Sequence, residues 1–574
     1  MITVTEPLIA GKNHREGGFR ALPFIVATSA FEKVSSYGLL PNMILYLRRE
    51  YRLEAATGAN ILFFWSAATN LTPIIGAFLA DSYFGRFPVI AFGSAISLLG
   101  TFLLWLTTVI PQARPPPCVQ FSDGCPSATT LQLLFLYLSF GLISVGAGGV
   151  RSSALAFGAD QLRKGENIKN AQILESFFSW YYAIASFAVV IAMTCVVYIQ
   201  DVMGWKAGFG VPVVLMIMSP LLFLLASPFY VKSRPKSSLF TRFAQVVVAA
   251  YKNRSLPLSS QVTNEAYHNW KDTVILAPSD KLRFLNKACI IRNPLEDLTP
   301  DGRASDPWSL CTVDQVEELK AIVKIIPIWS AGIIMAVTVS QSSFLVLQAS
   351  TMDRHMTSNF EVPAGSLNVF LVISLVVWIS LYDRVIIPLA SKLKGQPVRL
   401  SLKQRMGIGI LLSSASMVAL AVVECIRRET AIREGFIDDP NAVVHMSAMW
   451  LLPYNILGGL AEAFGAIGQN EFYYTELPKC MSSIAVTLVE MGFSAANLVA
   501  SFIMTSIDYF TKRGGEGSWV SSNINRGHYD YYYWLLASLS LINFLYYLVC
   551  SKAYGPCNAE RDNHPDESTS EGID

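Results

Sequence analysis

The sequence predicts an all-α integral membrane protein, and three observations lead to this prediction. Of the 574 residues, 52% are hydrophobic and only 15% are charged, whereas a soluble domain has about 25% charged residues. Ten stretches without Asp, Glu, Lys or Arg are each long enough to cross a bilayer as a helix. In hydrocarbon every backbone N–H and C=O must be paired within the segment, so runs of this length are helices and not barrel strands.

Twelve membrane-spanning helices are expected. Ten come from the uncharged stretches, and two more apolar stretches are interrupted by charge, one by Glu32 and Lys33 and the other by Glu490. Six spans precede a long polar segment and six follow it. The expected spans are 21–47, 55–80, 87–113, 124–150, 176–200, 207–231, 325–352, 362–382, 406–423, 440–461, 480–507 and 531–551.

The long polar segment divides the chain into two bundles of six helices. Its thirteen basic residues, together with basic short loops on the same side, favour the cytosol for this segment and for both termini. The exception to this distribution of basic residues is a group on the predicted outer side: Arg427, Arg428 and Arg433. The expected parts are an N-terminal bundle (1–231), a cytosolic linker (232–320), a C-terminal bundle (321–552) and a disordered cytosolic tail (553–574).

Three shorter features carry structural expectations. Residues 238–252 of the linker have the pattern of an amphipathic helix at the membrane surface. The aromatic run from Tyr529 to Trp534 is typical of an interfacial belt. Cys118 and Cys125 share the predicted outer loop after the third span, and the sequence leaves open whether they form a disulfide there.

Charged residues inside the first expected span form a polar stripe. Ser29, Glu32, Lys33 and Ser36 occur at i, i+3, i+4 and i+7, so they share one helix face. An ionisable group in a span is costly unless it faces a watery cavity or a partner, and is therefore a functional candidate. Two interpretations stay open: the stripe lines a central cavity, or it forms a structural ion pair between helices.

Two further charges lie beside small residues. Arg151 follows a run with glycine at 146, 148 and 149, which allows another helix to approach closely. Glu462 lies in a second glycine- and alanine-rich segment and is the best candidate for its anionic partner. Lys324 is expected to extend to the membrane interface, and Glu490 fits a cavity or a helix contact equally well.

Several motifs resemble a known transporter family along nearly the whole chain. The segment GAFLADSYFGR at 76–86 resembles the loop motif of the major facilitator superfamily, and FGADQ at 157–161, with FFSWYY at 177–182, resembles the signature of proton-coupled oligopeptide transporters. The stretch at 31–47 is similar to the first subfamily of the plant nitrate and peptide transporters, which contains nitrate transporters of vascular tissue. Further plant-type segments are QDVMGWKAGFGVP (200–212), QASTMDR (348–354), YDRVIIP (382–388), QRMGIG (404–409), GQNEFYY (468–474) and NINRGHYDYYYWLLA (523–537).

The resemblance implies a major facilitator fold, with 12 transmembrane helices in two pseudo-symmetric bundles that rock about a central site. The family's coupling motif on the first helix falls on Ser29, Glu32 and Lys33, so its first acid is missing here. The remaining roles implied are proton coupling by Glu32 and Glu462, substrate binding by Lys33, Tyr37, Arg151 and Thr338, and gating by Asp81, Arg86, Arg151 and Glu462.

Thr338 stands where a nitrate-binding histidine is found in the family, and a hydroxyl there can donate a hydrogen bond but supplies no charge. A threonine that is phosphorylated in the family corresponds to Val89, which has no hydroxyl to modify.

The function expected from these residues is proton-coupled transport of nitrate, of low affinity, at the plasma membrane. The alternative is an organic anion, such as a carboxylate hormone (gibberellin, abscisic acid or a jasmonate conjugate) or a glucosinolate; a dipeptide is least expected because the first-helix motif is broken. Motifs of membrane-embedded enzymes and phosphate loops are absent from the sequence, so no enzyme activity, cofactor or metal is expected. The expected partners are a small anion, protons and the bilayer, without nucleic acid, and a sensor that binds without transporting stays open.

Overall fold

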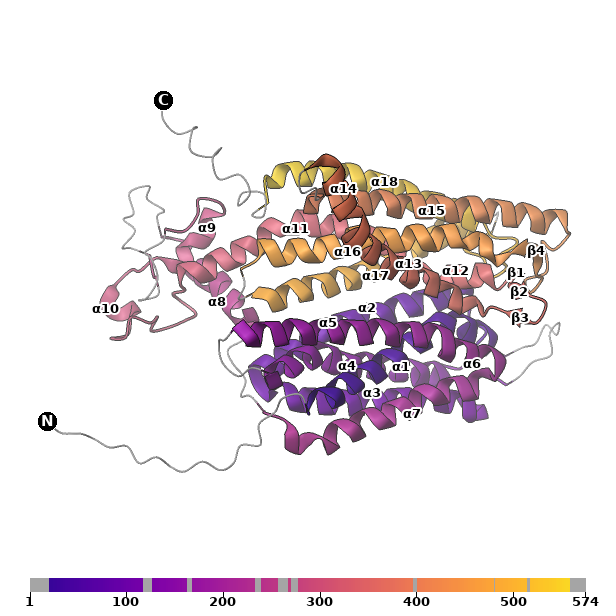
Figure 1. The fold of residues 1–574 in the computed structure, drawn as a ribbon, viewed down its shortest axis with the longest axis horizontal. Coiled ribbons are helices and arrows are strands. Elements are labelled where there is room, and N and C mark those ends of the chain that lie inside the picture. The colour runs from indigo at the N-terminus through magenta and orange to yellow at the C-terminus, as the bar shows by residue number, and fades with distance from the viewer. Residues whose placement is uncertain are drawn as a thin grey trace. The chain divides into compact units, whose positions relative to one another are not determined.

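The computed structural model describes residues 20–116, 126–162, 168–232, 239–256, 267–269, 277–395, 400–478, 481–513 and 517–557. Its helices fall into two compact units (Figure 1). Unit 1 comprises residues 1–40 and 75–236, and unit 2 comprises residues 41–74 and 237–574. The first two helices, α1 (Leu22–Arg49) and α2 (Ala55–Leu79), therefore each contribute to both units.

The division between the units differs from a single boundary after residue 231. Residues 41–74 group with unit 2 because polar side chains join them to its last helices. Asn60 accepts hydrogen bonds from Ser501 (2.6 Å) and Thr505 (3.2 Å), and Ser494 donates to the carbonyl of Ala67 (2.9 Å). The predicted parts, 1–231, 232–320, 321–552 and 553–574, stay predictions.

Unit 1 contains the N-terminal helices. Beyond its shares of α1 and α2, its helices are α3 (Arg86–Val109), α4 (Thr130–Leu162), α5 (Ile168–Ile191), α6 (Val197–Val202) and α7 (Gly204–Leu225). Two π-helical turns, η1 (Ala80–Phe84) and η3 (Ala192–Val196), extend α2 and join α5 to α6. Two short 3-10 turns are η2 (Pro111–Ala113) and η4 (Ser227–Phe229).

Unit 2 contains the linker and the C-terminal helices. The linker carries α8 (Leu239–Lys252), α9 (Arg283–Asn286), η6 (Lys287–Cys289) and α10 (Pro294–Asp297). The helices that follow are α11 (Val313–Val339), α12 (Ser342–Ala349), η7 (Ala364–Asn368), α13 (Val369–Leu381), η8 (Tyr382–Ile386), α14 (Ile387–Lys394), α15 (Leu402–Arg433), η9 (Ala448–Leu451), α16 (Leu452–Glu476), α17 (Ser482–Arg513) and α18 (Tyr529–Tyr554). Four short strands are β1 (Met352–Asp353), β2 (His355–Thr357), β3 (Phe360–Glu361) and β4 (Val444–Ser447).

Each of the twelve expected spans overlaps a helix, and ten described helical stretches are long and apolar enough to cross a membrane. The expected span 440–461 is displaced, because residues 444–447 form β4 and α16 begins at Leu452. Several helices run past the apolar segment that predicted them, because caps outside it supply the missing hydrogen bonds. Ser401 and Gln404 form a reciprocal capping box that starts α15, and Thr312 and Gln315 do the same for α11.

The glycines before Arg151 allow α4 to pack directly against the backbones of neighbouring helices. A Cβ at Gly146 would overlap the backbone of Ser97 on α3, and one at Gly149 would lie 2.8 Å from the Val89 carbonyl oxygen. On α2, a Cβ at Gly76 would lie 2.6 Å from the carbonyl oxygen of Gly148. The close approach that the sequence predicts is therefore present, and it fixes the position of the helix that carries Arg151.

The linker has a small apolar core of its own. Helix α8 lies within the segment expected to be amphipathic, and its apolar face is buried against protein: Val246, Ala249 and Ala250 pack with Cys289 and Cys311. Burial raises the pKa of each of these thiols to about 12. The face of α8 that the sequence suggested for the membrane surface is thus used inside the linker.

The short strands lie at the other end of unit 2 from α8–α10 (Figure 1). Strand β1 pairs in parallel with β4, and β2 pairs antiparallel with β3. Arg427, near the end of α15, is fully buried: it forms an ion pair with Glu424 (2.7 Å) and donates to Asn525 (2.6 Å) and to Thr351 (3.2 Å), which directly precedes β1. This accounts for one of the three exceptions in the charge pattern, because Arg427 is neutralised inside the protein.

The expected interfacial belt is wrong for three of the five aromatic residues in the run. Tyr529, Tyr532 and Tyr533 are buried, and Tyr529 and Tyr532 pack with their rings 5.6 and 5.5 Å from that of Phe344 on α12. These side chains occur where α18 faces protein. Tyr531 and Trp534, on the other face, are exposed.

The packing of α3 on α4 predicts the effect of adding one methyl group. Gly146→Ala would force Ser97 to move, and overpacking of this kind costs about 1–3 kcal/mol, so we expect the melting temperature of the purified protein to fall by several degrees. Gly141→Ala on the same helix is the control, because no atom lies within 4 Å of its added Cβ. Equal melting temperatures for the two variants would contradict the direct backbone contact.

The raised pKa of the linker cysteines predicts their reactivity. The thiolate is the nucleophile in alkylation, and both thiols are buried, so at pH 7.5 maleimide should leave Cys289 and Cys311 unmodified in the native protein. Peptide mass spectrometry before and after unfolding in detergent checks this. Modification of either residue before unfolding would show that the linker core is open.

Candidate functional site

A buried ion pair joins α1 and α4 within unit 1. The Arg151 guanidinium lies with Nη2 2.9 Å from Glu32 Oε1, and its Nε lies 3.1 Å from both carboxylate oxygens. Ser36, one turn along α1, donates to the same carboxylate at 2.7 Å. The Glu32 side chain is 0% exposed and that of Arg151 17% exposed. A carboxylate with this set of donors is fully satisfied without water.

Lys33 and Tyr37 complete a charge cluster around this pair. Lys33 Nζ lies 5.8 Å and the Arg151 guanidinium carbon 5.6 Å from the centre of the Tyr37 ring, so both cations are within reach of one aromatic ring. Among the described residues of unit 1, no carboxylate forms an ion pair with Lys33. We name Glu32, Lys33, Tyr37 and Arg151 the α1–α4 cluster; it holds two cations and one carboxylate.

Ser29 stands at the position of the missing acid and forms a hydrogen bond between helices instead of an ion pair. Its hydroxyl is hydrogen-bonded to that of Tyr181 on α5 at 2.6 Å, and Ser29 is buried. Of the stripe, Ser29 and Glu32 are therefore buried in protein, whereas Lys33 and Ser36 are partly exposed. The geometry of Glu32 is that of a helix-to-helix ion pair, one of the two interpretations that the sequence leaves open.

The predicted gating residues of unit 1 form an ionic bridge between helix ends. Arg86, at the start of α3, lies 2.6 Å from Asp160 at the end of α4 and 3.4 Å from Asp81 in η1, and it also donates to the carbonyl of Ala156 (3.2 Å). The structure thus brings Asp81 and Arg86 together. Their gating role stays a prediction.

Glu462 lies on α16 in unit 2, half buried, with glycine and alanine neighbours. Those small residues bring helices close: a Cβ at Gly459 would overlap the carbonyl oxygen of Leu371 on α13. Within unit 2, no described residue forms an ion pair or hydrogen bond with its carboxylate. Pairing of Arg151 with Glu462 stays a prediction, and in this structure Arg151 is paired with Glu32.

Thr338 is buried between α11 and α15. Its hydroxyl donates to the carbonyl of Met335 (2.6 Å) and is also hydrogen-bonded to Ser413 (2.6 Å). Because a hydroxyl has one proton to donate, binding an anion here would require breaking the contact with Met335. The predicted role in substrate binding therefore gains no support from this geometry.

The remaining predicted residues have plainer positions. Lys324 Nζ lies 4.1 Å from the centre of the Tyr554 ring, and Glu490 is half buried on α17. Cys118 and Cys125 lie outside the described residues. No group of three or more His, Cys, Asp and Glu side chains in the described part of the chain is placed to hold a metal ion.

Three residues of the site were not singled out from sequence. Asp160 and Tyr181 lie within the segments at 157–161 and 177–182 that carried the family resemblance, and Ser36 was on the polar stripe without a role. The family motifs could therefore have pointed to these residues. The motifs could not show which side chain each residue contacts, because the contacts depend on how the helices pack.

Comparison with known proteins gives the class. A model described as PTR2, the POT family, matches residues 87–520. From Arabidopsis thaliana, Protein NRT1/PTR FAMILY 1.2 is 56% identical over 94% of this chain and 90% of its own length. Protein NRT1/PTR FAMILY 1.1 is 54% identical over 96% of this chain and 94% of its own length. Protein NRT1/PTR FAMILY 1.3 is 44% identical over 96% of this chain and 99% of its own length.

Solved structures agree with the fold. The chain resembles an auto-inhibited POT family peptide transporter with a TM-score of 0.69 and 19% identity, covering 94% of this chain and 98% of that one. It resembles the POT family transporter PepTSo with a TM-score of 0.67 and 17% identity, covering 93% and 98%.

The fold is therefore that of a multi-pass major facilitator transporter, as predicted, and not of an enzyme. The chain belongs to the POT family of proton-coupled transporters, on its NRT1/PTR branch.

The ion pair predicts how stability responds to removing one partner. Arg151→Gln leaves Glu32 buried without its cation, and breaking a buried pair costs about 3–5 kcal/mol, so the melting temperature should fall strongly. The double variant Glu32→Gln with Arg151→Gln should recover most of the loss, because two amides can still hydrogen-bond. Lys33→Gln, which removes a charge outside the ion pair, is the matched control, and an equal loss in it would argue against the pair.

Proposed function

We propose that this protein carries nitrate together with protons across the plasma membrane, with low affinity, by alternating access and with both termini in the cytosol. The observation that carries the proposal is the excess of cations in the α1–α4 cluster. The Lys33 Nζ and the Arg151 guanidinium carbon lie 5.8 and 5.6 Å from the centre of the Tyr37 ring, and Glu32 is the carboxylate that pairs with Arg151 among the described residues of unit 1. Such a cluster favours a small anion, since an unpaired cation within a span is costly.

Protonation of Glu32 would couple proton and anion in this cluster. While Glu32 is ionised, both of its carboxylate oxygens accept hydrogen bonds from the Arg151 guanidinium. A proton on Glu32 removes the negative charge that pairs with Arg151, which weakens this ion pair and lets a nitrate ion compete for the guanidinium, next to Lys33. The guanidinium is planar and presents parallel N–H donors, which match the planar nitrate oxygens as they match a carboxylate.

Release would follow the same steps in reverse. When Glu32 loses its proton, the carboxylate competes with the anion for Arg151 and displaces it. Proton and anion therefore bind and leave together, which is the requirement for symport. In this scheme Ser29 takes no part, because a serine hydroxyl does not titrate and its hydrogen bond is made to Tyr181.

We further propose that Arg151 pairs with Glu462 in another state of the transport cycle. Glu462 has no ionic partner among the described residues of unit 2, which leaves its carboxylate available. Exchange of Arg151 between Glu32 and Glu462 would link the state of proton loading to the state of the gate, with Asp81 and Arg86 holding the helix ends. Arg151→Ala and Glu462→Ala should each abolish uptake while the protein stays at the cell surface.

The organic-anion alternative rests on Thr338. Since its hydroxyl is committed to Met335 and Ser413, nitrate would be held by Lys33 and Arg151 alone, and the same two cations suit a carboxylate equally well. The NRT1/PTR names of the relatives support the branch of the family but do not choose between these anions.

Uptake of labelled nitrate into oocytes at external pH 5.5 and 7.4 tests the proposal, with gibberellin and a dipeptide in parallel. We expect nitrate uptake several times higher at pH 5.5, saturating only at millimolar concentration. Glu32→Gln should remove this pH dependence, because its amide can no longer exchange a proton.

Surface biotinylation controls for expression, and Lys33→Gln is the companion variant: it should weaken nitrate uptake but keep its pH dependence. Uptake of gibberellin without nitrate would favour the organic anion. Uptake of neither compound above water-injected cells would contradict anion transport altogether.

A further inference from the structure

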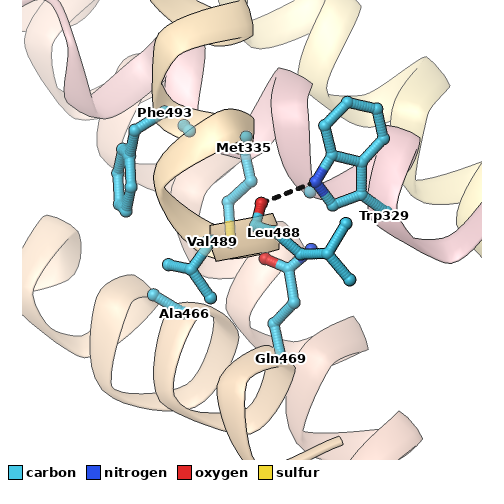
Figure 2. Close-up of a pocket in the computed structure, with 10 residues that line it drawn as sticks. Trp329, Met335, Ala466, Gln469, Leu488, Val489 and Phe493 are labelled. Carbon is cyan, nitrogen blue, oxygen red and sulfur yellow. Dashed lines mark hydrogen bonds between the residues drawn. The ribbon is translucent and has the colours of Figure 1, made fainter. Parts of the chain in front are cut away.

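Between α11, α16 and α17, unit 2 is filled by its own side chains (Figure 2). Met335 lies between Trp329 and Phe493, and Trp329 Nε1 donates to the carbonyl of Leu488 at 2.8 Å, drawn as the dashed line. The end of the unit that carries the short strands is different, because a titratable ring lies there between two charged groups. This ring belongs to His528, the residue directly before α18.

Arg428 determines which nitrogen of the His528 ring carries the proton. Arg428 Nη2 lies 3.2 Å from His528 Nε2, and Arg428 Nε donates to the carbonyl of Gly527 at 3.0 Å. A guanidinium can only donate hydrogen bonds, so Nε2 is the acceptor and the proton of the neutral ring is on Nδ1. The ring is also stacked on that of Tyr531, with centroids 4.6 Å apart and planes within 5°, so packing holds its orientation.

The protonated nitrogen faces a carboxylate. His528 Nδ1 lies 3.6 Å from Asp530 Oδ1, slightly beyond hydrogen-bonding distance, and both atoms are buried without a hydrogen-bond partner among the described residues. The other carboxylate oxygen of Asp530 accepts a hydrogen bond from the Cys425 thiol at 3.7 Å. Asp530 is therefore held beside the ring with one oxygen left to accept a hydrogen bond.

The remaining charges on the elements around the ring are paired or exposed. They are Glu424 with Arg427 on α15 (2.7 Å), Asp508 with Lys512 on α17 (3.0 Å), and Arg526, which is exposed in the loop. Two groups are left to act on the charge of the His528 ring: Arg428 repels an imidazolium, and Asp530 attracts one.

We propose that His528 is a pH-sensitive switch that holds the loop 518–528 to α15 only while its ring is neutral. In the neutral ring, Nε2 accepts a hydrogen bond from Arg428. Protonation places a second proton on Nε2, which removes this hydrogen bond and sets two cations against each other, and the imidazolium pairs with Asp530 on α18. Acid pH therefore loosens the loop from α15.

The switch operates at the pH values that a membrane surface meets, because an imidazole changes its charge between about pH 5 and pH 8. In the orientation proposed above, His528 is on the outer side of the membrane. The contacts that carry the switch all lie within unit 2. It therefore does not depend on which anion is transported, and its test reads the loop and not uptake.

Hydrogen exchange of the full-length protein in lipid nanodiscs tests the switch, with mass spectrometry of the peptides that cover 518–528. After correction for the intrinsic pH dependence of exchange, protection of this loop should be about fivefold lower at pH 5.5 than at pH 7.5, the size of one net hydrogen bond. His528→Gln should be equally protected at both pH values, because its amide oxygen can accept from Arg428 but does not titrate. Unchanged protection in the original chain, or the same loss in His528→Gln, would overturn the proposal.

His445→Gln is the matched control, because His445 lies in β4, is 84% exposed and pairs with Glu434 at 3.3 Å. This variant should keep the acid response of 518–528, and loss of the response would show that His528 is not the switch. Solid-state NMR of ¹⁵N-histidine in bilayers reads the tautomer directly. At pH 7.5 the signal that disappears in His528→Gln should come from a ring protonated at Nδ1; a ring protonated at Nε2 would overturn the contact with Arg428.

Discussion

The contact between Glu32 and Arg151 is the interaction on which the arrangement of unit 1 depends. Two groups that are each expensive to bury become tolerable only together, and only if both helices hold their positions closely. The glycines of α4 meet that requirement, because they place its backbone against α3 and α2. The packing is therefore as much a part of the site as the charges are.

The positions of most spans could be predicted from the sequence, because the rule behind them is local; the exception is 440–461, whose helix α16 begins at Leu452. A helix in hydrocarbon satisfies its own backbone, so apolar length is sufficient evidence. The short strands β1–β4 had no such signal: strands of two to four residues have too few side chains to show alternation. The buried face of α18 was also missed, since aromatic residues suit an interface and a protein core equally.

The candidate site could be predicted residue by residue but not contact by contact. Glu32, Lys33 and Arg151 were identified because charge inside a span is rare, and they do lie in one cluster. The sequence favoured Glu462 as the anion that faces Arg151, whereas in this structure Glu32 is its partner, because the pairing depends on helix packing. For Thr338 the residue type was a poor guide. A hydroxyl can donate a hydrogen bond to an anion, but here it donates its hydrogen bond to the carbonyl of Met335 in its own helix.

The division of α1 and α2 between the two units has a mechanical consequence. The boundary crosses α1 next to Pro41 and α2 close to Pro73. A proline inside a helix removes one backbone hydrogen bond and makes bending easier at that turn. Each shared helix therefore lacks one backbone hydrogen bond close to the point where it passes from one unit to the other, and bending of either helix is easiest at that turn.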